Sequence, residues 1–514
     1  MKFLASALRF EEFFHLAQPG PLAARARPRK CPALRREGDA LLPLASWRRA
    51  LPALAALGLA ACASGGASGG DPTLRIWPLA DRGADAIGSW RSELLSGAGS
   101  DWARKALCRP DGGCTFFGNT RGSFGLGPGT AFIAVGEIPD LRPQWARTYG
   151  GGGTDELDGA VATPDGGFVM FGSSDSRYTA GAGGAAPAPR PLVIRAAAEG
   201  EPRWVRALEG GGIHRFHGAA VEGGALVLVG YAAMSADTPG PAVVRLSEAG
   251  ALQWAETLDL GGGGYAVAVV GTGEGGVIVA GYLRSGNVAF AGASFLVRLD
   301  ASGRPLWARR YETEVPAQPR ALLRDAGGEL VLVGTLFDPR GGRSPFLLRV
   351  GGDGTLRVAR EYRGLEANEV HAAAEAGGGR IVMTGRQRDP FVNRQRGLAL
   401  LIDPGNRIRA YGTLSAQGSV ELTSVALARE GEYRLVGHTD SFGAAGLDIL
   451  AAVWLPAARG GTDELAPGIA ERELTVRTSP VEPRRVALPV EAREIPLDAL
   501  VVTPLRVPGG AGGR

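Results

Sequence analysis

Acidic and histidine side chains recur in the short segments that precede a set of apolar stretches, and their types could do chemistry. His214 and His217 lie three residues apart, as do Asp155 and Asp158. Carboxylates and imidazoles that converge could coordinate a divalent cation or grip a polar ligand. The candidate ligand-binding residues are Asp101, Asp155, Asp158, His214, His217, Glu366, Glu369, His371 and Glu421.

A second interpretation of these residues stays open. Asp155 and its counterparts can cap turns through side-chain to backbone hydrogen bonds. The sequence contains no zinc-type Cys/His set, Gly-x-Ser-x-Gly elbow, phosphate-binding loop or calcium loop. We therefore assign no catalytic residue and predict no cofactor. Whether the acidic and histidine residues hold a metal is left unknown, with a divalent cation as the compatible ion.

The elements that must position these residues are seven apolar stretches, each ending in glycine and spaced by about 50 residues. Their glycines are Gly118, Gly172, Gly230, Gly281, Gly334, Gly385 and Gly437. A fixed repeat of this length, written in strands and turns, is typical of a β-propeller. We predict an all-β, seven-bladed β-propeller of four-stranded blades. Corresponding loops of such a ring lie on one face, which could bring the candidate residues to one mouth of the channel.

The two ends of the repeat are out of phase, and this predicts how the ring closes. The segment that begins at Trp90 looks like a fourth strand with no blade before it. The segment around Ile449 looks like a third strand with no fourth strand after it. The N-terminal Trp90 strand therefore completes the last blade, which removes both sheet edges. Contact between the Trp90 and Ile449 segments would support this closure.

Tryptophan opens the predicted fourth strand of several blades, at Trp145, Trp204, Trp254 and Trp307. A buried tryptophan covers about 150–250 Å² of surface, and one blade alone cannot bury both of its faces. We interpret these residues as packing between blades rather than as a surface on which ligands stack.

The N-terminal segment differs from the rest of the chain in charge. The formal net charge is +4, yet residues 1–61 carry ten Lys and Arg against four Asp and Glu, which leaves −2 for the remainder. A nearly neutral mature chain gives no support to nucleic-acid binding. We divide the chain into a leader at 1–61 whose start is over-extended, a flexible tether at 62–71, the propeller at 72–460, and a Pro-rich strap or tail at 461–514.

Arg48 and Arg49, the apolar run that follows and Leu59-Ala60-Ala61-Cys62 resemble a bacterial lipoprotein signal. By that resemblance Cys62 is the lipidated N-terminus, and Ala63 after it favours the outer membrane. The alternative is a plain secretory signal with an incidental cysteine. Cys108 and Cys114 flank a tight turn and are expected to form a disulfide in an oxidising compartment, with two free thiols as the alternative.

The second repeat, with Trp145-Ala-Arg-Thr-Tyr-Gly-Gly, Asp155 and Asp165-Gly-Gly167, resembles a family of bacterial surface propellers. That resemblance covers about residues 88–455 and implies the architecture alone, since the family has no established common activity to transfer. A weaker likeness to quinoprotein-like propellers comes from Asp300, Gly303 and Trp307.

We predict a non-enzymatic, lipid-anchored propeller of the cell envelope, exported to the outer membrane or cell surface. Its partners would be the membrane, through the anchor, and an envelope protein or polysaccharide; we expect a monomer. The alternative is a quinoprotein-like oxidoreductase, or a hydrolase or lyase of cell-surface polymer. An enzyme should bring charged side chains together in a deep pocket, whereas a binding protein should present a wider face with exposed aromatic residues.

Overall fold

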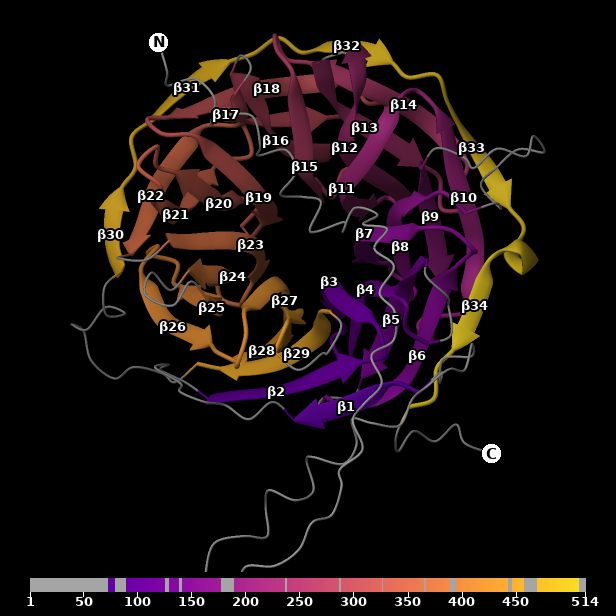
Figure 1. Ribbon diagram of the computed structural model, residues 1–514. Coiled ribbons are helices and arrows are strands. Elements are labelled where there is room, and N and C mark those ends of the chain that lie inside the picture. Colours follow the sequence, from indigo (N-terminus) through magenta and orange to yellow (C-terminus); the bar gives the residue numbers. More distant parts are fainter. Residues whose placement is uncertain are drawn as a thin grey trace, which may run out of the picture. The chain divides into compact units, whose positions relative to one another are not determined.

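The computed structural model describes residues 73–78, 89–124, 129–137, 141–176, 189–235, 238–285, 288–325, 327–364, 367–388, 394–441, 446–456 and 469–507. These residues form seven antiparallel sheets arranged as a ring (Figure 1). The prediction of a seven-bladed β-propeller is confirmed. The only helix among them is a 3₁₀ turn, η3 (Leu497–Ala499). Within the same ranges no helix has the length and apolar character needed to cross a membrane.

The blades are numbered here in chain order, and the strands of each blade are given from the innermost to the outermost. Blade 1 contains β3 (Ser100–Cys108), β4 (Cys114–Arg121), β5 (Thr130–Glu137) and β6 (Pro143–Gly150). Blade 2 contains β7 (Asp155–Ala162), β8 (Phe168–Ser174), β9 (Arg190–Ala196) and β10 (Pro202–Gly210). Blade 3 contains β11 (Ile213–Glu222), β12 (Ala225–Ser235), β13 (Thr238–Leu246) and β14 (Leu252–Asp259).

The next three blades repeat the same order of strands. Blade 4 contains β15 (Gly264–Gly271), β16 (Val277–Ser285), β17 (Val288–Leu299) and β18 (Pro305–Thr313). Blade 5 contains β19 (Ala317–Arg324), β20 (Leu330–Phe337), β21 (Arg343–Val350) and β22 (Leu356–Gly364). Blade 6 contains β23 (Ala367–Glu375), β24 (Ile381–Arg388), β25 (Gln395–Ile402) and β26 (Ile408–Leu414).

Blade 7 joins the two ends of the repeat. It contains β27 (Val420–Arg429), β28 (Glu432–Thr439) and β29 (Asp448–Leu455), and its fourth strand is β2 (Ser89–Ser96). Strands β2 and β29 are antiparallel, with Trp90 opposite Trp454 and Leu95 opposite Ile449. The predicted closure by the Trp90 strand is therefore confirmed.

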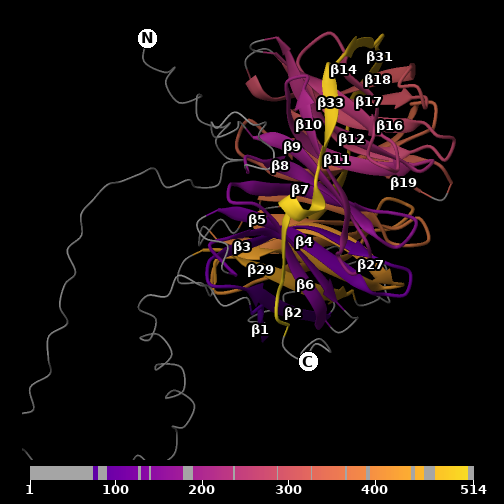
Figure 2. The same ribbon diagram turned by 90° about the vertical axis from the view of Figure 1, so that its right-hand side faces the viewer.

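An outer belt runs around the ring (Figures 1 and 2). Its five strands follow blades 5, 4, 3, 2 and 1 in that order, adding a fifth strand to each: β30 (Ile469–Glu473), β31 (Val476–Pro480), β32 (Arg484–Ala487), β33 (Val490–Ile495) and β34 (Val501–Pro504). At the N-terminal end, β1 (Arg75–Pro78) adds a fifth strand to blade 7. Leu74 N donates to Arg506 O at 2.9 Å, which ties the two ends of the outer layer together.

The hydrophobic core lies between neighbouring blades. Between blades 3 and 4, for example, Val229 and Val243 pack in one buried cluster with Val279 and Phe295. Three tryptophans of the fourth strands reinforce these junctions, because their indole N–H groups bond to a turn of the next blade. Trp204 Nε1 donates to Glu248 O, Trp254 Nε1 to Ala301 O and Trp307 Nε1 to Gly352 O, at 3.0–3.1 Å. This geometry is that of interblade packing.

The turn that joins β3 and β4 carries the two cysteines of the propeller. Cys108 and Cys114 lie opposite each other in the two strands and form a disulfide.

Candidate functional site

Every blade has a β-bulge at the same place in its innermost strand. One residue of that strand has no partner in the second strand, and such an extra residue re-aims its side chain. The bulges fall in the innermost strands, which lie around the centre of the ring (Figure 1), and this central region is called the channel below. Their extra residues, called the bulge ring below, are Arg104, Asp158, His217, Val267, Arg320, His371 and Thr423.

The seven repeated glycines make these bulges fit. Each glycine lies in the second strand beside a bulge. A backbone carbonyl oxygen of the first strand occupies the space that a Cβ atom at this position would need. A Cβ atom would lie 2.3 Å from Trp102 O at Gly118 and 1.8 Å from Glu421 O at Gly437. No side chain tolerates such an approach. The sequence repeat is therefore the signature of the bulge as well as of the blade.

Every blade has the same order of strands, so the seven innermost strands all run in the same direction along the channel. The bulge residue lies at or just before the middle of each innermost strand, so the bulge ring is closer to the end of the channel at which these strands begin than the strands' last residues are. That part of the channel is called the polar half here. Six of the seven bulge residues are polar, and they meet further charged groups from neighbouring strands.

Blades 6 and 7 contribute an ion-pair network to the polar half. Arg386 donates to Glu369 Oε2 at 2.9 Å and to Glu421 Oε2 at 3.0 Å. His371 Nδ1 lies 3.2 Å from Glu421 Oε1, and His438 Nε2 lies 4.0 Å from Glu421 Oε2. The two glutamates are thus held by a shared guanidinium.

The protonation states in this network follow from burial and neighbouring charge. Burial lowers the pKa of His371 and His438 to about 4, so both imidazoles are neutral at pH 7. Burial opposes ionisation of Glu421, but its neighbours outweigh this effect and lower its pKa. Arg386 is therefore the cation that pairs with Glu421 at pH 7.

The buried polar atoms without a hydrogen-bond partner in the described residues include one beside the bulge in each of the adjacent blades 7, 1 and 2. These three are His438 Nδ1, Arg104 Nε and Asp158 Oδ2, and the three residues are called the polar arc below. The Asp158 side chain is 4% exposed, and its other oxygen accepts a hydrogen bond from Arg215 Nε at 2.6 Å. Buried polar atoms of this kind need a partner from water or a ligand.

Blades 3 and 4 present a row of aromatic rings. His214 and His217 stack on Tyr231 with ring centroids 5.4 and 5.7 Å apart. Tyr231 contacts Tyr265 at 4.9 Å, and Tyr265 contacts Tyr282 at 5.2 Å. All three tyrosines are partly exposed. The row is called the aromatic row below, and it combines flat apolar faces with hydroxyl groups.

The candidate residues from the sequence divide into two groups. Asp101 and Asp155 are fully buried turn caps. Asp155 Oδ2 accepts from Gly151 N at 2.8 Å, and Asp101 Oδ2 accepts from Gly97 N at 2.7 Å. The capping interpretation describes these two, and they face no ligand site. Burial, opposed by hydrogen bonds from Thr120 and its neighbours, raises the pKa of Asp101 to about 6.

The remaining candidates have different positions. Asp158, His217, Glu369, His371 and Glu421 take part in the contacts of the polar half, and His214 joins the aromatic row. Glu366 and Cys62 lie outside the described residues. Within the described ranges no group of three or more His, Cys, Asp or Glu side chains is placed to hold a metal ion.

Sequence reasoning missed His438 and all of the arginines and tyrosines of this site. A signal for the bulge ring was present in the spacing. Each bulge residue precedes the repeated glycine of its own blade by 14 positions, or by 13 in blade 3. The tyrosines of β12 and β16 directly follow those glycines, at Tyr231 and Tyr282.

Comparison with known proteins carries no argument about this chain beyond its own structure. No family model and no curated protein matches the chain. Solved β-propeller structures are similar to it at low identity. They include a protein of unknown function from Dyadobacter fermentans (12% identity, 59% of this chain and 95% of that chain, TM-score 0.40). A neuraminidase-like protein of subtype N11 from A/flat-faced bat/Peru/033/2010 (H18N11) has 10% identity, coverage of 75% and 98%, and a TM-score of 0.37. A glucose dehydrogenase has 13% identity, coverage of 57% and 94%, and a TM-score of 0.33. At these TM-scores the similarity carries no argument about activity.

Proposed function

We propose that this protein is a non-enzymatic, exported and lipid-anchored propeller that binds a glycan in the polar half of its channel. The observation that carries the proposal is the coexistence of the polar arc with the aromatic row. The arc offers a donor at Arg104 and an acceptor at Asp158, both buried and without a hydrogen-bond partner at the atoms named above. A sugar hydroxyl can donate and accept, so it complements both.

The aromatic row complements the apolar face of a sugar ring. A sugar ring has an apolar face of C–H groups, which packs against an aromatic face while its hydroxyls point to the sides. Tyr231, Tyr265 and Tyr282 present such faces across blades 3 and 4. We therefore favour a glycan over a protein as the ligand.

Whether the polar half could be an active site depends on whether its carboxylates are free or paired with arginines. Charged side chains do converge in the polar half, which is the feature expected of an enzyme. Glu369 and Glu421, however, are paired with Arg386, and Asp158 is paired with Arg215. Carboxylates committed to guanidinium groups are poor general acids and bases, because the ion pairs must first be broken. Binding is the function that this arrangement supports better.

A glycan-binding screen tests the proposal. The purified full-length protein is applied to an array of bacterial surface polysaccharides, and the affinity for each bound glycan is measured. Tyr265→Ala should weaken binding about tenfold (~1.4 kcal/mol), whereas Tyr265→Phe should retain binding because it keeps the aromatic face. Equal affinity of the alanine variant and the wild type would contradict this site. Release of shorter saccharides during the incubation would favour the enzyme alternative.

A further inference from the structure

The end of the channel opposite the polar half has a different chemistry. A pocket of about 580 Å³ opens there, within the size range of small-molecule sites. Most of its wall comes from the second halves of β7, β11, β15 and β19, in blades 2 to 5, and from the turns that follow β7 and β19, and Glu375 at the end of β23 adds a residue of blade 6. The pocket is called the funnel here. It lies beyond the bulge ring, since Val161 follows Asp158 by three residues and Leu323 follows Arg320 by three.

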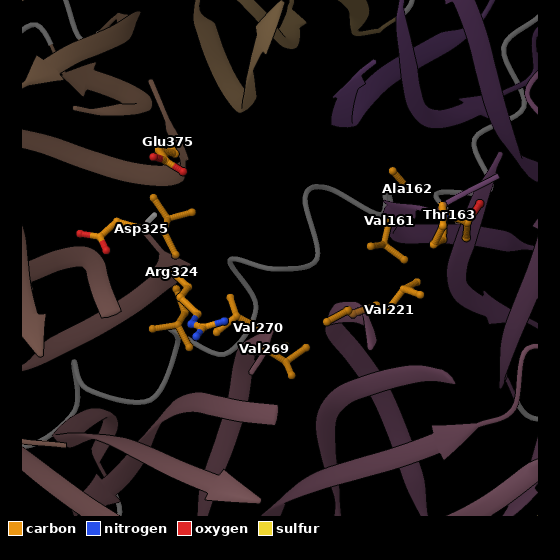
Figure 3. Close-up of a pocket in the computed structure, with 15 residues that line it drawn as sticks. Val161, Ala162, Thr163, Val221, Val269, Val270, Arg324, Asp325 and Glu375 are labelled. Carbon is orange, nitrogen blue, oxygen red and sulfur yellow. The ribbon is translucent and has the colours of Figure 1, made fainter. Parts of the chain in front are cut away.

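The lining of the funnel is aliphatic. Val161, Val221, Val269 and Val270 line the right and lower sides of the pocket in Figure 3. Ala219 and Leu323 complete the apolar wall, and no aromatic side chain contributes to it. An aliphatic wall of this kind is complementary to a flexible alkyl chain, which gains affinity from each methylene that leaves water.

The charged groups lie at one side of the same pocket, and Thr163 adds a hydroxyl group at the other side. Arg324 and Glu375 are labelled on the charged side in Figure 3, together with Asp325. Asp325 Oδ2 is 3.4 Å from Arg349 Nη1, so its charge is already paired. The rim therefore offers one cation at Arg324 and one anion at Glu375. A head group that carries both signs matches this rim better than a head group with a single charge.

We propose that the funnel is a binding site for a single-chain zwitterionic amphiphile. Its alkyl chain lies against Val161, Val221 and Val269. Its anionic group faces Arg324, and its cationic group faces Glu375. The site is separate from the glycan site of the polar half, and either site can exist without the other.

Binding of a homologous series of alkylphosphocholines tests the proposal. Octyl, decyl and dodecyl chains are titrated into the full-length protein below their micelle concentrations by isothermal calorimetry. Affinity should rise about fourfold for each added methylene, which corresponds to roughly 0.8 kcal/mol, until the funnel is full. Affinity that does not depend on chain length would overturn the proposal.

Two variants locate the binding. Val221→Asp places a charge in the wall and should reduce dodecyl affinity at least tenfold, whereas Val501→Asp, at a 52% exposed valine of β34, should not change it. If Val221→Asp fails to fold, Ala219→Phe is the second variant, because it fills part of the funnel without adding charge. In this variant the affinity should stop rising at a shorter alkyl chain than in the wild type. Unchanged binding in folded Val221→Asp or Ala219→Phe protein would overturn the assignment. Because the probes contain no sugar, their failure leaves the glycan proposal untouched.

Discussion

Gly385 and Glu369 touch through their backbones: a Cβ atom on Gly385 would lie 1.9 Å from the Glu369 carbonyl oxygen. The contact lies beside the bulge that projects His371 in blade 6. The same relationship recurs in all seven blades. The repeated glycine looks like a simple strand end in the sequence. Its lack of a Cβ atom leaves room for the bulge, and the bulge sets the direction of the side chain at the channel.

Gly385→Ala should destabilise the protein by about 3 kcal/mol, because the backbone must move to relieve the overlap. Denaturant unfolding measures the change. Gly352→Ala is the matched control, since a Cβ atom there meets nothing within 4 Å and its φ is not positive. It should change stability by less than about 0.5 kcal/mol. A small effect at both positions would show that the bulge does not require glycine.

The sequence was sufficient to predict the blade count and the closure, because both depend on a repeat whose phase can be followed. The Trp90 strand had to belong to the last blade once each blade was counted as four strands. The polar half was predicted only in part. The pairing of Asp158 with Arg215 joins two blades, and contact between side chains 57 positions apart depends on rotamers that a repeat does not specify. The belt was also beyond prediction in detail, because Arg484–Ala487 is exposed throughout and carries no alternation.

Removal of the belt should weaken the whole ring. A chain that ends at residue 468 loses the buried side chains of Ile469, Val490, Ile495, Leu500 and Leu505. Burial of five aliphatic side chains contributes on the order of 8 to 15 kcal/mol. The truncation also exposes the outer edges of blades 1 to 5, and exposed edges promote association.

Thermal unfolding and light scattering measure both effects of this truncation. The shortened protein should melt at a lower temperature and self-associate. A chain that ends at residue 507 keeps every belt strand and should behave as the full-length protein. Equal melting temperatures for the two truncations would show that the belt does not stabilise the ring.

Asp101 should make stability depend on pH. Its pKa is raised to about 6 in the folded protein, mainly by burial, so the folded state binds the proton more tightly than the unfolded state. Its contribution to stability is therefore fully present below pH 4 and is lost as the pH rises to 6. The loss is about 3 kcal/mol for a shift of this size.

The comparison of Asp101→Asn with the wild type isolates this effect, since the contributions of the histidines cancel. The variant should gain stability relative to the wild type between pH 4 and pH 7. Asp498→Asn, at an exposed position after β33, is the control and should follow the wild-type curve. Parallel curves for Asp101→Asn and the wild type would refute the raised pKa.

The proposed lipid anchor predicts a clear effect of Cys62→Ser. The full-length protein expressed in a Gram-negative host should incorporate a labelled fatty acid and sediment with membranes. Cys62→Ser should lose both the label and the sedimentation, whereas Cys31→Ser should keep them. A labelled Cys62→Ser protein would show that the anchor is elsewhere.

The central claim is that the polar half of the channel binds a glycan through the polar arc and the aromatic row. Its most direct test is calorimetric titration of the best glycan from the array into the wild type, Asp158→Asn and Asp498→Asn. The account predicts at least a tenfold loss of affinity for Asp158→Asn, because its buried oxygens no longer both accept hydrogen bonds, and wild-type affinity for Asp498→Asn. Wild-type affinity for a correctly folded Asp158→Asn protein would contradict the account.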